Sequence, residues 1–306
     1  MAVPAPTPLI RPEYLIEAAG LGLFMVSATV CVALLEHPAS PLHGWIASGD
    51  VRRALIGVAM GLTALALIYS PWGKRSGAHF NPAVTLTFFR LGKVAPRDLV
   101  GYVLAQFIGG TAGLALASYA LGGLAAHPTV NYVATLPAGS PWLAFGAEFF
   151  ISGLLMTVVL QISNRPRLAP YTGMFAAACV ALFITLEAPI SGMSMNPART
   201  FASFTHAGGW GYYWIYLLAP PLGMLSAAAL YQAIATRGIA CAKLRHVDGQ
   251  PCLFCDYQRH LKKVLESTNA SAIQNDKISS MPSGDCERLS GSSSVRNKLP
   301  GAASHP

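Results

Sequence analysis

The residues best suited to bind a ligand lie in a ten-residue pattern that occurs twice. Residues 76–85 and residues 191–200 both read Ser-Gly-x-x-x-Asn-Pro-Ala-x-Thr. Each asparagine, Asn81 and Asn196, precedes a proline that suits the first position of a helix. The asparagine oxygen can cap that helix, which leaves the amide N–H groups free to donate hydrogen bonds. The pattern predicts two fixed donors that orient a neutral molecule through its lone pairs, and we expect no enzyme chemistry.

The composition indicates that these donors lie in a membrane protein. Of the 306 residues, 53% are hydrophobic and only 11% are charged, whereas soluble domains carry about 25% charged residues. The formal net charge is +8, but the cations flank apolar runs, where they set topology and contact anionic lipid. We therefore expect membrane lipid as a partner and no nucleic acid.

Apolar runs of two lengths predict the fold. Two short runs, 80–89 and 195–204, begin at the Asn-Pro pairs and cannot cross a bilayer alone. Non-helical backbone at membrane depth must be buried in protein or line a wet cavity, so we predict two re-entrant half-helices. The runs that approach the roughly 20 residues needed to cross lie at 14–35, 53–70, 99–121, 142–162, 171–187 and 213–236. The expected fold is an all-α membrane protein with six transmembrane helices and two half-helices.

Three spans and one half-helix per repeat imply an inverted repeat, because an odd number of crossings reverses the second copy. The two Asn-Pro ends then meet near the bilayer middle, where such paired interruptions mark a binding site. Short loops rich in Lys and Arg, including Lys74 and Arg75, place both termini in the cytoplasm. Arg52 and Arg53, on the expected outer side, disagree with this orientation. The expected location is a plasma membrane or a bacterial inner membrane.

Three of the charged residues in or beside the expected spans are candidates for a specific role. Arg199 follows the second Asn-Pro pair, where the first copy has Val84. A cation at membrane depth is unfavourable unless it faces water, so we predict that Arg199 donates into a pore and repels cations. Glu17 and Glu148 lie early in the first and fourth spans. Their matched positions predict acceptors for the unpaired backbone of the two loops, and proton transport is the alternative role.

On these residues the chain resembles the aquaporin (major intrinsic protein) family over roughly residues 10–240. The residues that carry the resemblance are Asn81, Pro82, Ala83, Asn196, Pro197, Ala198 and Arg199, with the paired Glu17 and Glu148. The resemblance implies an aquaporin-like fold and a homotetramer with one pore per subunit.

The resemblance also assigns an outer selectivity filter. The matching positions are Arg199, Met193, Ile184 and, in the second span, Met60 or Gly61. Strict water channels have an aromatic residue in the second span and His in the fifth. Typical glycerol channels have Asp after the filter arginine, where this chain has Thr200. The ring is therefore expected to be apolar; water is expected to pass, and passage of larger neutral solutes stays open.

The segment beyond the sixth span offers a metal site. Cys241, His246, Cys252 and Cys255 read C-x4-H-x5-C-x2-C, and three cysteines with one histidine form an accepted structural zinc set. Reduced cytosolic thiols argue against a structural disulfide. The alternative is a basic segment with incidental cysteines, and we expect either form to lie far from the pore residues.

These patterns divide the chain into four parts. They are an N-terminal cytoplasmic segment (1–12), a channel domain (13–240, with repeats near 13–121 and 142–236), a Cys/His segment (241–266) and a tail (267–306). The tail is rich in Ser, Gly and Pro and is predicted to be disordered.

The sequence thus predicts a passive channel for water and small neutral solutes such as glycerol or urea, which excludes protons and ions. It needs no cofactor besides the candidate zinc. Two other classes stay open: a proton-coupled secondary transporter that uses Glu17 or Glu148, and a structural or adhesive membrane protein with a closed pore.

Overall fold

The structure is a computed structural model that describes residues 11–235, 238–247, 249, 251–262 and 266. The predicted tail (267–306) and residues 1–10 of the predicted N-terminal segment lie outside the described residues. Residues through Tyr257 form one compact unit, and all that follows concerns this unit. Its described residues form helices and contain no strand.

Six helices are long and apolar enough to cross a membrane. They are α1 (Pro12–Glu36), α3 (Gly49–Tyr69), α6 (Pro96–Leu121), α8 (Pro141–Ser163), α9 (Thr172–Leu186) with the preceding turn η2 (Ala169–Tyr171), and α12 (Tyr213–Ile234) with the preceding turn η3 (Trp210–Tyr212). The predicted number of spans is confirmed, and the ends differ by a few residues. Helix α3 begins earlier than expected, because the side chain of Ser48 caps it by accepting a hydrogen bond from the Val51 N–H.

Two shorter helices correspond to the predicted half-helices. Helix α5 (Pro82–Arg90) and helix α11 (Pro197–Ala207) each begin at the proline of an Asn-Pro pair. The remaining helical pieces are short: α2 (Pro41–Trp45), α4 (Pro71–Ser76), α7 (Gly123–Ala126), α10 (Ala188–Ser191), η1 (Asn131–Val133), η2 (Ala169–Tyr171) and η3 (Trp210–Tyr212).

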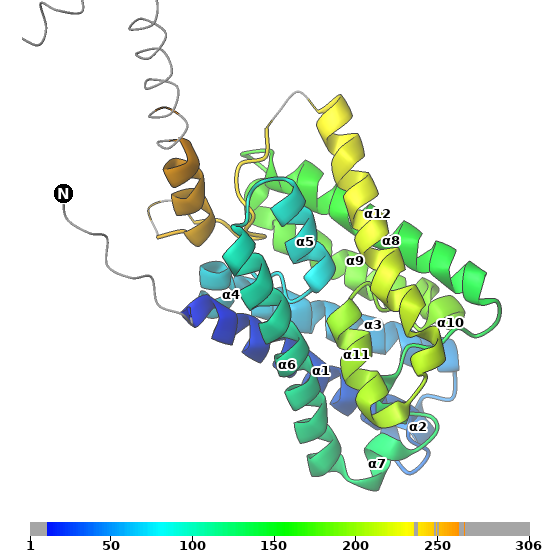
Figure 1. Ribbon diagram of the computed structural model, residues 1–306. Helices are drawn as coiled ribbons and strands as arrows, with labels where there is room; N and C mark the ends of the chain where they lie inside the picture. Colours follow the sequence, from blue (N-terminus) through cyan, green and yellow to red (C-terminus); the bar gives the residue numbers. More distant parts are fainter. Residues whose placement is uncertain (1–10, 236–237, 248, 250, 263–265, 267–306) are drawn as a thin grey trace, which may run out of the picture. The chain divides into compact units, whose positions relative to one another are not determined.

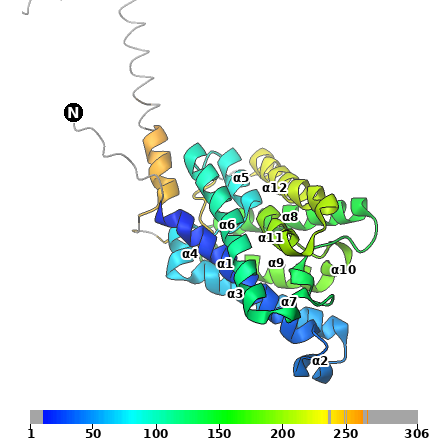
Figure 2. The same ribbon diagram turned by 60° about the horizontal axis from the view of Figure 1, so that its bottom comes forward.

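The packing follows the internal repeat. Helix α1 packs on α6 in the first half, α8 packs on α12 in the second, and α3 packs on α9 between the halves. Each half-helix contacts the third long helix of the other half, α5 on α12 and α11 on α6. In Figures 1 and 2, α5 and α11 accordingly lie inside the bundle between α6 and α12.

Glycines allow the closest of these helix contacts. A Cβ atom on Gly113 would lie 2.2 Å from the Gly22 carbonyl oxygen, and one on Gly223 would lie 2.1 Å from the Phe149 oxygen. No side chain fits at such distances, so small residues fix the α1–α6 and α8–α12 contacts.

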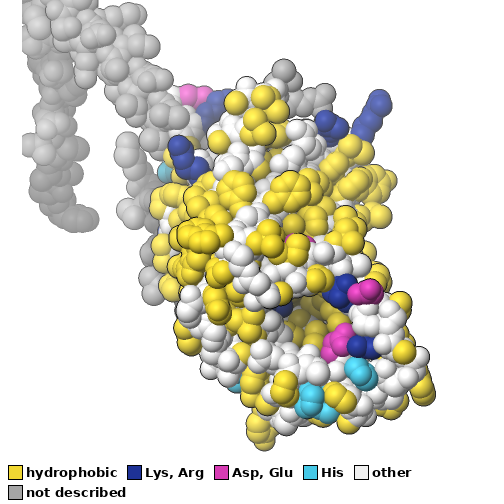
Figure 3. Space-filling model, turned by 90° about the vertical axis from the view of Figure 1, so that its right-hand side faces the viewer, with side chains coloured by type: hydrophobic (Ala, Val, Ile, Leu, Met, Phe, Trp, Pro, Cys, Tyr) yellow, Lys and Arg dark blue, Asp and Glu magenta, His cyan; other side chains and the backbone are white. Residues whose placement is uncertain are grey.

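The outer surface of the bundle is apolar. Large hydrophobic side chains are exposed on the long helices, among them Leu23, Val58, Ile108, Phe150 and Leu230. On the face drawn in Figure 3, hydrophobic side chains form a broad belt, with charged side chains gathered toward its two ends. A surface of this kind matches lipid and not water, as expected of a multi-pass membrane protein.

Candidate functional site: a cavity between two matched loops

The two motif loops have the same unusual backbone conformation. Gly77 and Gly192 end helices α4 and α10 with positive φ angles of 103° and 85°. Non-glycine residues at matching places in the two loops also have positive φ: Ala78, Phe80, Met193 and Met195. Such residues are uncommon and persist only where the surroundings hold them.

A buried carboxylate holds the first loop. Glu17, on α1, is fully buried. Its Oε1 atom accepts hydrogen bonds from Ser76 Oγ (2.7 Å) and the His79 N–H (3.1 Å). Its Oε2 atom accepts from the Phe80 N–H at 2.6 Å. The unpaired N–H groups of His79 and Phe80 in this loop are therefore satisfied by one side chain.

Glu148, on α8, does the same for the second loop. Its Oε1 atom accepts from Ser191 Oγ and from the Ser194 N–H, both at 2.7 Å, and its Oε2 atom accepts from the Met195 N–H at 2.7 Å. Glu148 is also fully buried. Neither carboxylate lines the cavity described below, so both face the loops and not a path for solutes.

Two tyrosines support the loops in a way that sequence reasoning missed. The hydroxyl of Tyr102, on α6, donates to the Ser76 carbonyl, and that of Tyr216, on α12, donates to the Ser191 carbonyl, both at 2.6 Å. The tyrosines follow Asn81 and Asn196 at nearly the same separation, so a search for matched polar residues in the third span of each half finds them.

Both asparagines cap the half-helices. The Oδ1 atom of Asn81 accepts from the Ala83 N–H at 2.9 Å. The Oδ1 atom of Asn196 accepts from the N–H groups of Ala198 (3.1 Å) and Arg199 (3.2 Å). The capping oxygens thus fix which way each amide nitrogen points.

The amide nitrogens join the two loops. Asn81 Nδ2 donates to the Met195 carbonyl at 2.7 Å. Asn196 Nδ2 donates to the Phe80 carbonyl at 2.8 Å. An amide nitrogen carries two N–H groups, so each asparagine uses one for this contact and keeps a second. Both asparagines line the cavity between the loops.

This cavity has a volume of about 720 Å³ and passes along both loops. At one end it reaches Glu36, Asp50 and Arg53, and at the other it reaches Ile68, His79 and Leu244. The lining between them includes Leu21, Phe24, Met60, Val84, Val133, Met156, Val180, Ile184, Met193 and Arg199. The wall is thus mostly apolar, with polar groups at the two asparagines and Arg199.

The structure separates the two candidates for the second-span filter position. Met60 lines the cavity together with Ile184, Met193 and Arg199. Gly61 lies against the neighbouring helix α9, where an added Cβ would be 2.8 Å from the Ala177 carbonyl oxygen. The assignment of Gly61 is therefore corrected: it allows the helix contact, and Met60 occupies the wall.

Arg199 offers a donor to the cavity. Its backbone N–H caps onto Asn196, and its Nη1 atom is buried without a hydrogen-bond partner among the described residues. Buried donors are normally paired, so this guanidinium is available to a molecule in the cavity.

A loop that sequence analysis left unassigned completes the wall. Every residue from Pro128 to Ala134 except Tyr132 lines the cavity. The Thr135 hydroxyl is 2.7 Å from that of Thr200, which is 2.6 Å from the Ser194 hydroxyl. Thr200 thus joins this loop to the second motif at the place where glycerol channels typically have Asp.

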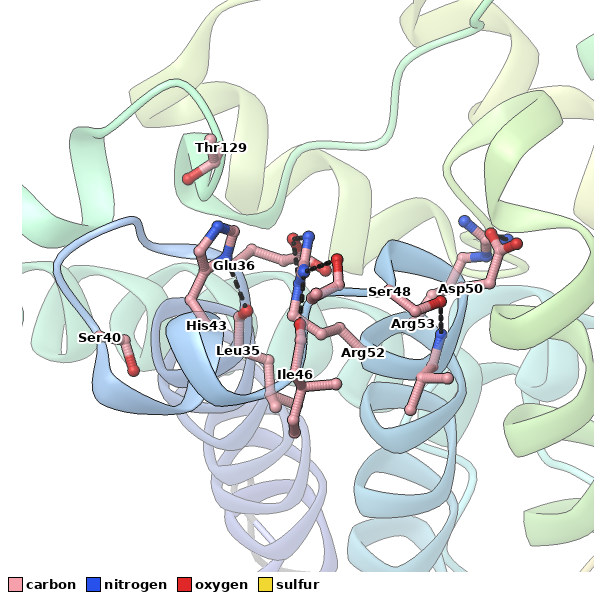
Figure 4. A network of polar contacts seen from close by, with 12 residues as sticks. Leu35, Glu36, Ser40, His43, Ile46, Ser48, Asp50, Arg52, Arg53 and Thr129 are labelled. Carbon is pink, nitrogen blue, oxygen red and sulfur yellow. Dashed lines mark hydrogen bonds and ion pairs between the residues drawn. The ribbon is translucent and has the colours of Figure 1, made fainter.

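The two arginines that disagreed with the predicted orientation form ion pairs at the end of the cavity that Glu36 and Asp50 line. The Arg52 Nη2 atom lies 3.1 Å from the Glu36 carboxylate, and Arg53 Nη2 lies 2.7 Å from that of Asp50. Arg53 Nε also donates to the Thr185 carbonyl at 3.0 Å. Figure 4 shows these side chains grouped at the ends of α1 and α3, so both cations have local partners.

The Cys/His segment meets the opposite end of the cavity. His79 Nε2 lies 2.8 Å from the Ala242 carbonyl oxygen, and the Leu244 N–H donates to the Gly77 carbonyl at 3.1 Å. Leu244 itself lines the cavity. The expectation that this segment lies far from the pore residues was therefore wrong, because the chain folds back onto the first motif loop.

A family model described as Major intrinsic protein matches residues 11–231. The chain belongs to the major intrinsic protein family. It is 32% identical to Aquaporin NIP1-1 of Zea mays over 188 residues, which are 61% of this chain and 65% of that protein. It is 37% identical to Aquaporin AqpM of Methanothermobacter marburgensis over 186 residues, 58% of this chain and 75% of that protein.

The chain thus spans slightly less than two thirds of the maize relative. Among solved structures, it resembles the aquaglyceroporin from Plasmodium falciparum with a TM-score of 0.61 and 20% identity, over 74% of this chain and 96% of that one. This likeness confirms the fold of the major intrinsic protein family and carries no argument about solutes.

Proposed function

We propose that this protein is a passive membrane channel for water and small neutral solutes, and that it excludes ions and protons. The observation that carries the proposal is the cavity of about 720 Å³, which passes the amides of Asn81 and Asn196 and the Nη1 atom of Arg199, which has no hydrogen-bond partner among the described residues. A channel needs a path through the bundle, and donors along that path orient a neutral solute. The two carboxylates in the cavity wall, Glu36 and Asp50, lie at one end and are ion-paired.

The half-helices supply the field that opposes cations. Helices α5 and α11 begin at Pro82 and Pro197, and their capping asparagines are joined to the opposite loops at 2.7 and 2.8 Å. Both positive dipole ends therefore point at the same part of the cavity. Arg199 adds a full positive charge nearby, so an entering cation meets repulsion at two successive places.

The asparagines supply orientation. Each has one amide N–H in a contact with the other loop, and the second is available to an oxygen atom in the cavity. A water molecule that accepts from both amides turns its own hydrogens away from the centre. This orientation interrupts a chain of water molecules along which protons would move.

The filter residues suggest selection by size. Met60, Ile184 and Met193 offer no strong donor or acceptor to a solute, and Arg199 alone offers N–H groups there. A ring of this kind passes neutral solutes according to width. We infer that glycerol- or urea-sized molecules pass as well as water, because the apolar members of the ring offer them no specific contact.

The proposal includes a homotetramer with one pore per chain, embedded in lipid, with both termini in the cytoplasm. The exposed apolar belt supports contacts with lipid and with neighbouring copies. Most Lys and Arg residues beside the spans, including Lys74 and Arg75, favour this orientation, whereas Arg52 and Arg53 count against it.

A proton-coupled transporter is the main alternative, and Glu17 and Glu148 are its candidate carriers. Their hydrogen bonds to the loops and their absence from the cavity wall argue against it. The test uses purified protein in liposomes and light scattering after osmotic shocks with water, glycerol and urea. A solute flux that exceeds that of empty liposomes and does not change with an imposed pH gradient supports a channel. Uptake that follows the gradient supports the transporter, and flux equal to that of empty liposomes supports a closed structural protein.

A further inference from the structure

The segment after the last span brings four metal-binding side chains together. The ligand atoms of Cys241, His246, Cys252 and Cys255 all lie within 4.8 Å of one another. The Cys241 sulfur is 3.6 Å from that of Cys252 and 3.8 Å from that of Cys255. A tetrahedral zinc site with Zn–S bonds of about 2.3 Å has sulfur atoms about 3.8 Å apart. A disulfide needs about 2.05 Å, so the thiols are spaced as ligands and not as a bridge.

Backbone and charged groups lie beside the sulfur atoms. The backbone N–H groups of Lys243 and Cys255 contact the sulfurs of Cys241 and Cys252, as supporting hydrogen bonds do at metal sites. Three thiolates and a neutral imidazole around Zn²⁺ leave one net negative charge. Lys243 is only 4% exposed, and its charge interacts with the sulfur of Cys252. A buried ammonium needs a nearby anion, and the loaded site provides it.

The segment has little structure of its own to keep it in place. Its described residues between Gly238 and Cys252 form neither helix nor strand. It is nevertheless buried, with Ala242 at 0% exposure and Cys252 at 2%. Because metal binding can supply the free energy that orders a short irregular segment, a closed four-ligand site accounts for this arrangement.

The ordered segment packs on the first motif loop. Ala242 and Leu244 hydrogen-bond to His79 and Gly77. The ring of Phe254, next to Cys255, stacks on His79 at 5.4 Å with an angle of 10°. Leu244 reaches the cavity wall. In the sequence, the metal ligands thus flank the residues that contact the first motif loop and the cavity wall.

We propose that Cys241, His246, Cys252 and Cys255 bind one Zn²⁺ that fixes this segment on the Gly77–His79 loop. The zinc thereby holds Leu244 in the wall at this end of the cavity. The metal site itself is independent of the proposed channel function, whereas its effect on flux rests on that function.

The first test measures metal in full-length protein purified without chelators. About one zinc per chain is expected for a closed four-ligand site. The double variant Cys252→Ser with Cys255→Ser should lose it, and the matched control Cys31→Ser with Cys179→Ser, in α1 and α9, should keep it. Less than about half an equivalent in the parent, or equal zinc in both double variants, would overturn the proposal. So would a Cys241–Cys252 disulfide in fresh protein.

A second measurement keeps the test valid if the double variant misfolds. The parent is treated with a chelator, then reloaded with Zn²⁺ or with Co²⁺, whose absorption reports tetrahedral thiolate ligation. Trypsin probes the Lys243–Leu244 and Arg245–His246 bonds. Both should resist cleavage with metal, be cleaved after chelation and resist again after reloading. Cleavage that does not depend on metal would overturn the proposal that zinc fixes this segment on the Gly77–His79 loop.

The link to the pore is tested by glycerol flux in liposomes. Chelation should raise the glycerol flux of the parent, because release of the segment withdraws Leu244 from the wall. It should leave the glycerol flux of the double variant unchanged. Leu244→Ala should raise flux while it keeps its zinc. Flux that chelation leaves unchanged, with zinc and tryptic protection as expected, would overturn this link while the metal site stands. Flux absent from every sample would instead count against the channel function.

Discussion

Asn81 and Asn196 each donate a side-chain hydrogen bond to the backbone of the opposite motif loop. The amide of Asn81 donates to the carbonyl of the residue before Asn196, and the amide of Asn196 donates to the carbonyl of the residue before Asn81, at 2.7 and 2.8 Å. The two half-helix ends are therefore one unit, and a change at either asparagine should affect both loops.

Asn81→Asp tests this unit. A carboxylate oxygen would face the Met195 carbonyl, which loses its donor, so we expect a destabilisation of about 1–3 kcal/mol. The added negative charge should also weaken the barrier to cations. Thermal unfolding in detergent and cation leak in liposomes measure the two effects. Gln161→Glu, the same chemical change at a partly exposed position near the end of α8, should show neither. Unchanged stability of Asn81→Asp would contradict the reciprocal contact.

Arg199 is expected to exclude cations. Arg199→Val removes the guanidinium of the filter, so water flux should be maintained or rise while proton or cation leak becomes measurable. A pH-sensitive dye inside liposomes reports the leak. Arg199→Lys keeps a positive charge at this position and should keep the exclusion of cations. Normal selectivity in a correctly assembled Arg199→Val protein would falsify the assigned role.

Ile184 should set the width of the filter. Ile184→His narrows the ring and should reduce glycerol and urea flux more than water flux. Ile184→Ala widens it and should raise glycerol flux more than water flux. Stopped-flow light scattering with the three solutes measures both ratios. An equal change for every solute in both variants would place the constriction elsewhere in the cavity.

Glu17 is expected to act as a structural acceptor. Glu17→Gln replaces one acceptor oxygen by an N–H₂ group, which would oppose donors from Ser76 and His79 or from Phe80 and Gln106. Each buried group left unpaired costs about 1–3 kcal/mol, so the melting temperature should fall. Glu148→Gln should behave alike. Glu13→Gln breaks an ion pair with the half-exposed Arg75 and should have little effect.

A second readout separates this role from proton transport. If Glu17 carries protons, Glu17→Gln should abolish a response of uptake to a pH gradient while stability is kept. Solute flux in the parent protein that already ignores the gradient, together with a lower melting temperature of the variant, agrees with the structural role.

The sequence by itself determined the spans, the repeat and the two loops. Apolar length and Asn-Pro capping act within a few residues along the chain, so they predict where α5 and α11 begin without knowledge of the rest. The matched Glu17 and Glu148 could be assigned to the loops for a similar reason. In an internal repeat, both loops have unpaired backbone N–H groups that need an acceptor.

The tertiary structure decided what faces what across the bundle. Met60 and Gly61 are neighbours in sequence. Only the packing of α3 on α9 shows that Met60 lines the cavity, whereas Gly61 lies in the contact between the two helices. The position of Leu244 beside Gly77 was also beyond the sequence. Contacts between residues that are far apart in the sequence depend on how whole helices pack and on which surfaces an irregular segment packs against. Neither produces a periodic pattern in the sequence.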